Sequence, residues 1–286
     1  MAASSATEEL IIRTDDGVEL SGERRGSGPA IVLLHGLTAT RRYVVMGSRT
    51  LERGGYRTIA YDARGHGHST AAADPNAYGY ERLARDLEEV LDTLGLERAV
   101  LAGASMGAHT AVRFAIRHPE RVAGLGLITP AFDPGLRVTP TALAGWDALA
   151  RGLREGGVEG FVDAYDFSAV PVEWRGTVEK VVRQRLAAHE HPGAVADALE
   201  VVPRSRPFEQ MAELAGIEAP TVVVASRDEA DPDHPLALGE RYAQTIPYAE
   251  FVVEESSPPA SPARSPIAWQ GGQLSKVLAE LATNAA

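Results

Sequence analysis

The sequence predicts an α/β fold with a mostly parallel central sheet, helices on both faces and a helical insertion. Strand-like and helix-like segments alternate over most of the 286 residues, the pattern of parallel strands joined by helical crossovers. The runs 30–34 and 122–128 contain only apolar residues and glycine, as expected of strands buried on both faces. From 133 to 219 only helix-like segments follow. We therefore predict a core of residues 1–132 and 220–286, interrupted by a helical cap, 133–219.

Each element has its own local signal. The turn residues 15–17 join two opening strands, 9–13 and 18–24, as a hairpin. Helix 80–94 is the clearest, because its leucines share one face and Gly95 ends it. Further strands are expected at 30–34, 57–61, 100–103, 122–128, 221–225 and 251–254. Further helices are expected at 41–54 and 273–282 in the core and at 141–155, 158–166, 172–189, 194–201 and 208–215 in the cap.

Composition narrows the function classes. The chain carries 28 basic and 39 acidic residues, a net charge of −11, and no basic run that suggests nucleic acid or an anionic membrane. The absence of cysteine excludes disulfides and a cysteine nucleophile. Residues 1–9 lack the pattern of a signal peptide, and no apolar run approaches the length of a membrane span. We expect a cytoplasmic protein that acts on a small molecule; the oligomeric state stays open, a homo-oligomer included.

The most informative stretch is Gly103-Ala104-Ser105-Met106-Gly107, which lies between an apolar strand pattern and a helix pattern. This is G-x-S-x-G in the strand–turn–helix setting that gives the motif its meaning. The two glycines permit a turn too sharp for larger side chains. The turn places the Ser105 hydroxyl at a helix N-terminus, where developing negative charge is favoured. The pattern predicts a nucleophilic serine.

A second loop supplies a predicted oxyanion hole. His35-Gly36-Leu37 ends the strand 30–34, and Gly36 lets the backbone approach a ligand closely. An oxyanion hole needs two N–H groups aimed at one point. Met106 and Leu37 are the expected donors, and His35 is expected to bind local backbone.

The glycine-rich segment 61–69 follows the next strand, at the sheet edge where ligands bind in open α/β folds. We expect Asp62 and Arg64 to pair and hold this loop. Asp62, His66 and His68 are conceivable metal ligands, but no further ligand cluster accompanies them. The sequence therefore implies no metal, and it contains no nucleotide-binding glycine loop that would imply a cofactor.

Together these motifs resemble the α/β-hydrolase superfamily, specifically its small cap-bearing esterase, lactonase and haloperoxidase-like members. The matching motifs stand in the family's order at 34–36, 61–69, 103–107 and 223–232. The resemblance implies an α/β-hydrolase fold and a serine nucleophile at Ser105. It also implies an acid at Asp228, between Ala225 at the family's glycine and Pro232 at its proline. Asp231 and Asp133 are the alternatives.

The chain departs from the family at the histidine base. The family places a histidine after the last strand, but this sequence has none after His234. A serine hydroxyl is a poor nucleophile without a base. His234, in the same loop as Asp228, is the leading substitute. The cap pair His189 and His191 and the loop pair His66 and His68 are alternatives, and a site without any base is another.

The expected function is that of a serine hydrolase acting on a small apolar carboxylic ester or lactone through an acyl-enzyme on Ser105. Turnover is expected to be weak because the usual base is missing. Two other readings stay open. A lyase or cyclase could use the same oxyanion pocket without an acyl-enzyme. A protein with a degenerate site could bind a small ligand without turnover.

Overall fold

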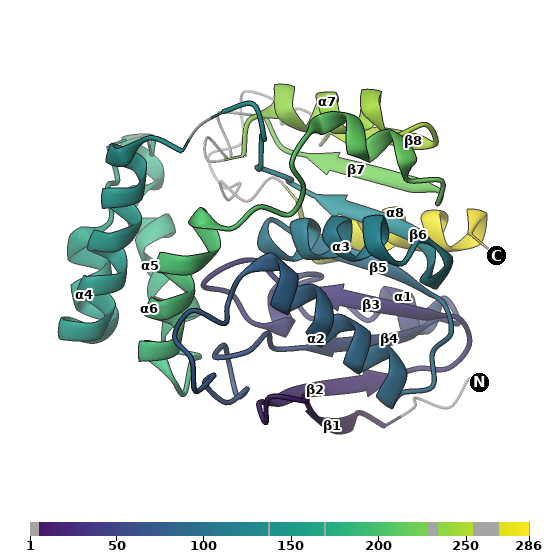
Figure 1. Cartoon of the computed structure of the whole chain (residues 1–286), viewed down its shortest axis with the longest axis horizontal. Helices are drawn as coiled ribbons and strands as arrows, with labels where there is room; N and C mark the ends of the chain where they lie inside the picture. The colour runs from purple at the N-terminus through teal and green to yellow at the C-terminus, as the bar shows by residue number, and fades with distance from the viewer. Residues whose placement is uncertain (1–5, 137, 169, 228–233, 254–268, 286) are drawn as a thin grey trace.

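The computed structural model describes residues 6–136, 138–168, 170–227, 234–253 and 269–285. Its centre is an eight-stranded sheet in the order β1-β2-β4-β3-β5-β6-β7-β8 (Figure 1). β2 pairs antiparallel with β1 and β4, and the strands from β3 to β8 run parallel. The strands are β1 Glu8–Arg13, β2 Glu19–Arg25, β3 Ala30–Leu34, β4 Arg57–Tyr61, β5 Ala99–Ala104, β6 Val122–Ile128, β7 Thr221–Ala225 and β8 Ala249–Val253.

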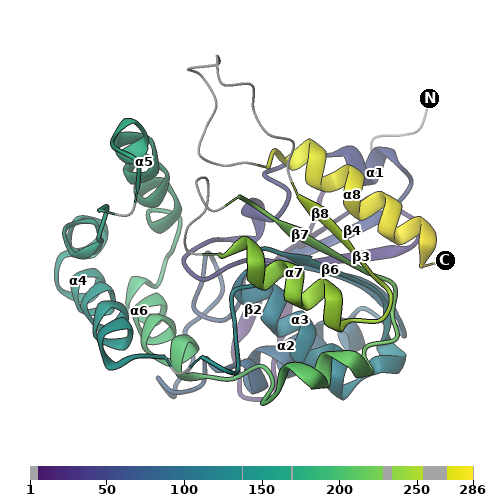
Figure 2. The same ribbon diagram turned by 90° about the horizontal axis from the view of Figure 1, so that it is seen from above.

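Helices cover both faces of this sheet, as Figure 2 shows. On one face lie α2 Tyr80–Thr93, α3 Met106–Arg117 and α7 Leu236–Thr245. On the other lie α1 Thr50–Arg53 and α8 Gly271–Asn284. An apolar core lies on each face of the sheet. Because side chains alternate along a strand, β3 contributes to both cores, with Val32 in one and Ile31 in the other. The predicted α/β fold is confirmed.

Most of the chain between β6 and β7 forms a group of helices beyond one end of the sheet (Figure 1), whereas Phe208, Leu214 and Ile217 in its last part belong to the core beside the sheet. Its long helices are α4 Pro140–Ala164, α5 Arg175–Leu186 and α6 Pro192–Val201. α4 unites the two predicted helices 141–155 and 158–166, with a kink at Gly157 (φ 61°). The kink brings the backbones of Gly152 and Gly160 so close that a Cβ on either would overlap the other's carbonyl. Residues 133–219 are called the helical segment below.

Two predicted helices differ from the structure, and one observed helix was not predicted. The expected helix 41–54 is replaced by a short 3₁₀ turn at Arg41–Tyr43 and by α1, because Met46 and Gly47 have positive φ angles that end a right-handed helix. In place of the helix 208–215 the structure has a 3₁₀ helix at Met211–Gly216. Finally, α7 was not predicted, although Leu238 and Tyr242 are spaced one turn apart and both are buried.

The N-terminus of α8 closes one edge of the molecule. The indole N–H of the buried Trp269 donates to the carbonyl of Ala225, the last residue of β7, at 3.0 Å. Gly271 packs against the carbonyl of Val45, where a Cβ would overlap it. None of the helices in the described part of the chain is long and apolar enough to cross a membrane.

Candidate active site

Ser105 lies on a tight turn between β5 and α3. Its backbone has φ 49° and ψ −112°, a conformation that L-residues rarely adopt and that costs about 1–3 kcal/mol. The two motif glycines make the turn feasible. A Cβ on Gly103 would overlap the carbonyl of Gly107, and a Cβ on Gly107 would overlap the carbonyl of Leu34. The Ser105 N–H donates to the carbonyl of Ile128 at 2.9 Å, which fastens the turn to β6.

His234 lies beside this serine. Its Nε2 is 2.9 Å from the Ser105 Oγ, a hydrogen-bond distance at which the hydroxyl can donate to a neutral imidazole. His234 stands between β7 and α7, directly before Pro235 at the start of that helix. The sequence placed it in this loop, and the fold brings the two loops together because β5, β6 and β7 are neighbours in the sheet.

The two predicted donor N–H groups belong to Met106, next to the serine, and to Leu37, in the loop after β3. Met106 is the first residue of α3, so its N–H has no carbonyl partner within the helix. Leu37 follows Gly36. The backbone at Gly36 passes close to the serine, because a Cβ added there would lie 3.5 Å from the Ser105 Cβ. Within the described residues, neither the Leu37 nor the Met106 N–H donates a hydrogen bond. Both N–H groups are therefore without an acceptor in the part of the chain that the structure describes.

Part of the surroundings of this site is apolar. Met106 and Leu37 pack with Ala194 and Ala198 of α6. Leu37 also touches a second apolar cluster of the helical segment, to which Trp146 belongs. Apolar side chains of α4 and α6 therefore pack against Leu37, and those of α6 share a cluster with Met106.

Only one of the three candidate acids lies among the described residues. Asp228, the predicted acid, and Asp231, its alternative, lie outside the described residues. Asp133, the remaining alternative, accepts a hydrogen bond from the N–H of Gly135 at 2.9 Å and pairs with Arg241. Its carboxylate is thus engaged in holding the loop after β6.

Two buried histidines fix the neighbouring loops. His35 donates from Nδ1 to the Gly36 carbonyl and accepts from the Ala63 N–H at Nε2, each at 2.8 Å, the backbone role predicted for it. His109 accepts from the N–H groups of Ala131 and Phe132 at 3.0 and 3.1 Å. Burial lowers the pKa of each ring to about 3, so both are neutral. Neither is a candidate base, because their acceptor nitrogens are occupied.

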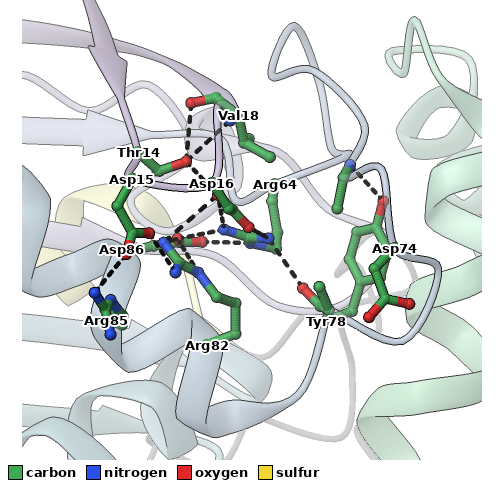
Figure 3. A network of polar contacts seen from close by, with 12 residues as sticks. Thr14, Asp15, Asp16, Val18, Arg64, Asp74, Tyr78, Arg82, Arg85 and Asp86 are labelled. Carbon is green, nitrogen blue, oxygen red and sulfur yellow. Dashed lines mark hydrogen bonds and ion pairs between the residues drawn. The ribbon is translucent and has the colours of Figure 1, made fainter.

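The expected pairing of Asp62 with Arg64 is wrong. Arg64 is fully buried and binds Asp86 through two hydrogen bonds of 2.7 Å each, as Figure 3 shows. It also binds Asp16 in the opening hairpin at 2.9 Å. Asp62 instead pairs with Arg41. The guanidinium therefore ties α2 and the hairpin to the loop 61–69, a long-range arrangement without a local sequence signal.

The alternative bases have other partners. His66 is buried and donates from Nδ1 to its neighbour Arg64's carbonyl at 2.9 Å. His68 is exposed and contacts Glu190 at 2.7 Å. His189 binds the N–H of Gly67 and the carbonyl of Thr38, whereas His191 is the N-cap residue of α6. No group of three metal-ligating side chains comes together among the described residues.

The structure also reveals residues that sequence reasoning missed. Arg185 of α5 donates to the Leu37 carbonyl at 3.1 Å, and Tyr80 of α2 contacts the His109 ring at 3.0 Å. No local pattern marks either residue, because both contacts join segments far apart in the sequence. Only the tertiary fold brings them to the site.

Comparison with known proteins identifies the family. A family model described as "alpha/beta hydrolase fold" matches residues 29–160. The chain is 31% identical over 260 residues to a 2-hydroxy-6-oxononadienedioate/2-hydroxy-6-oxononatrienedioate hydrolase of Paraburkholderia phymatum, covering 87% of this chain and 88% of the relative.

Solved structures agree with this assignment. A thermophilic esterase from Thermogutta terrifontis superposes with a TM-score of 0.77 at 25% identity, covering 97% of this chain and 99% of the esterase. An alpha/beta hydrolase from Sphaerobacter thermophilus gives 0.67 at 26% identity, covering 95% and 99%. The fold, the relatives and the superpositions lead to one conclusion: this chain belongs to the α/β-hydrolase superfamily and is an enzyme with hydrolase activity.

Proposed function

We propose that the protein is a serine hydrolase of small apolar carboxylic esters or lactones. In this proposal Ser105 attacks the carbonyl carbon while His234 takes the hydroxyl proton as general base. The N–H groups of Leu37 and Met106 stabilise the oxyanion of the tetrahedral intermediate. Collapse of that intermediate breaks the bond between the carbonyl carbon and the alkoxy oxygen, which receives the proton from His234, and an acyl-enzyme remains on Ser105. The alcohol of an ester departs, whereas that of a lactone stays attached to the acyl group. Water, activated by His234, then releases the acid.

One observation carries this proposal: the His234 Nε2 lies 2.9 Å from the Ser105 Oγ. The distance falls within the range required of a base before proton transfer. The weak turnover expected from the sequence rested on a missing base. A histidine within hydrogen-bond distance of the serine favours a competent site, so the turnover number decides between the two expectations.

The remaining parts of the site follow from the same reasoning. We assign Asp228 as the acid that orients His234, on the strength of its family motif, with Asp231 as the alternative. We assign residues 133–219 as a cap over the pocket, supported by the contacts of α6 with Leu37 and Met106. The apolar character of these contacts supports an apolar substrate, and the similarity to an esterase supports the ester class.

Substitution of Ser105 and His234 tests the proposal. Activity is measured on short-chain nitrophenyl esters, on lactones and on the dioate named for the Paraburkholderia relative. Ser105→Ala is expected to abolish hydrolysis. His234→Ala is expected to lower kcat by about 10⁴-fold or more, since removal of one member of a catalytic triad has such effects. His191→Ala is the matched control and is expected to retain activity.

The acyl-enzyme has a direct signature. A fluorophosphonate is expected to add covalently to the wild-type protein and not to Ser105→Ala, as seen by intact-protein mass spectrometry. Turnover that survives Ser105→Ala would refute the acyl-enzyme and favour a lyase or cyclase. Wild-type activity in His234→Ala would refute His234 as the base. Ligand binding without any turnover would favour the degenerate site.

A further inference from the structure

The loop that carries the Leu37 amide is a tight turn with an unusual residue in it. The Ala39 N–H donates to the Gly36 carbonyl at 3.0 Å, so Leu37 and Thr38 are the two central residues of a β-turn. Thr38 has φ 65°, and a β-turn position with positive φ normally takes glycine or asparagine. A β-branched residue there is strained. Such a conformation persists where surrounding contacts hold it.

Two side chains of the helical segment supply those contacts. His189, just after α5, donates from Nε2 to the Thr38 carbonyl at 3.0 Å. Arg185, in the last turn of α5, donates to the Leu37 carbonyl at 3.1 Å and to the Thr38 hydroxyl at 3.2 Å. The strained turn therefore accepts hydrogen bonds at the carbonyls of Leu37 and Thr38 and at the Thr38 hydroxyl. All three contacts fall directly after the Leu37 amide.

The second nitrogen of His189 ties in another loop. Its Nδ1 accepts a hydrogen bond from the Gly67 N–H at 2.8 Å, so the ring joins the turn 36–39 to the loop 61–69. Because Nε2 donates and Nδ1 accepts, only the neutral Nε2–H tautomer makes both bonds. Burial lowers the pKa of His189, and the nearby Arg185 opposes its protonation, whereas Asp62 favours it. The neutral His66 ring lies 5.5 Å away.

We propose that Arg185 and His189 are positioning residues that hold the Leu37 N–H in line with the oxyanion, so that the helical segment sets kcat as well as substrate fit. The inference rests on the proposed function, since it assigns a role to the oxyanion hole of that reaction. In this role neither residue touches the substrate. A displacement of about 1 Å in a catalytic group can cost roughly 10²-fold in rate, so a released turn has a measurable effect.

Steady-state kinetics on a nitrophenyl ester tests the inference through three variants of His189. His189→Ala is expected to lower kcat by roughly 10- to 100-fold, less than the 10²–10³ for complete loss of an oxyanion donor, with KM changed by less than about 3-fold. His189→Gln places an amide N–H near the position of Nε2 and is expected to rescue kcat. His189→Asn keeps only an acceptor for Gly67 and is expected not to rescue it.

A matched control separates positioning from general loosening of the helical segment. Glu190→Gln weakens the exposed contact with His68 and leaves the turn 36–39 untouched, so kcat is expected to stay at the wild-type value. Arg185→Lys retains one donor and is expected to lose less kcat than Arg185→Ala. Thermal midpoints are measured for every variant, and where His189→Ala does not fold, the comparison of Gln with Asn carries the test.

The outcomes distinguish this inference from the proposed function. If the wild-type protein does not react with a fluorophosphonate at Ser105, the proposed function fails whatever the variants do. If the wild type reacts and turns over but His189→Gln and His189→Asn have equal kcat, the positioning role is overturned. An equal loss of kcat in Glu190→Gln would overturn it as well. Lower thermal midpoints with wild-type kcat would reduce both residues to structural contacts.

Discussion

Lowering the pH from about 7 to about 5 is expected to destabilise this protein through its buried histidines. Burial holds the pKa of His35 and of His109 at about 3, whereas an exposed histidine in the unfolded chain titrates near 6.5. Between these values the unfolded state binds the proton and the folded state does not, so stability falls as the pH falls below 6.5. Each pH unit costs about 1.4 kcal/mol per histidine.

The expected loss follows directly. At about pH 5 each of the two rings costs about 2 kcal/mol relative to pH 7, or about 4 kcal/mol together. The pKa values of His66 and His189 are lowered in the same direction and add to the loss. Among the carboxylates, burial raises the pKa of Glu89, which opposes the loss. Asp16, whose pKa is lowered by its hydrogen bond with Arg64, keeps its contribution until the pH falls to about 4.

Urea denaturation followed by circular dichroism at both pH values, at constant ionic strength, measures the effect. In His109→Gln the difference between the two pH values is expected to shrink by about 2 kcal/mol, because one of the titrating groups is gone. His118→Gln is the control, because that ring is partly exposed and pairs weakly with Glu88 at 3.8 Å. A wild-type protein that loses less than about 1 kcal/mol between the two pH values would refute the reasoning.

Three substitutions test the structural framework. Gly107→Ala is expected to cost about 3 kcal/mol or more, because its Cβ would overlap the Leu34 carbonyl, and urea denaturation measures the loss. Gly95→Ala is its counterpart in open space with φ 62°, and only the backbone cost of about 1–2 kcal/mol is expected in the same assay. Asp86→Ala removes the carboxylate that accepts two hydrogen bonds from the buried guanidinium of Arg64. The free energy of unfolding is expected to fall by about 3–5 kcal/mol. A urea midpoint equal to that of the wild type would contradict the assigned network.

The strands and helix α2 could be predicted because their signals are local. Apolar runs and turn residues mark β3 and β6, and one leucine face marks α2. The helix expected at 41–54 was wrong because the backbone turns at Met46 and Gly47, which have positive φ angles. Its chain bends at Gly47 next to the place where Gly271, more than two hundred residues later, packs against Val45.

Within the candidate site, too, the residues with a local sequence signal could be predicted and the contacts that depend on the tertiary fold could not. Ser105 could be located from its motif because a nucleophile on a strand–helix turn requires glycines at fixed spacing. His234 carried no motif, and its approach to Ser105 depends on the order of β5, β6 and β7 in the sheet. The partners of Arg64 could not be predicted at all. The choice among Asp16, Asp62 and Asp86 is made by burial and geometry, which the spacing of charges along the chain does not encode.

The hydrogen bond from Trp269 to the end of β7 gives the protein a built-in optical reporter. Its buried indole lies in the core, whereas the other two tryptophans, Trp146 and Trp174, belong to the helical segment and are partly exposed. A buried indole emits at shorter wavelengths than a solvated one. In a Trp146→Phe, Trp174→Phe protein the emission therefore follows the core alone, and in Trp269→Phe it follows the helical segment alone. Stopped-flow fluorescence can then show whether the two parts of the chain unfold as one cooperative unit or in separate steps.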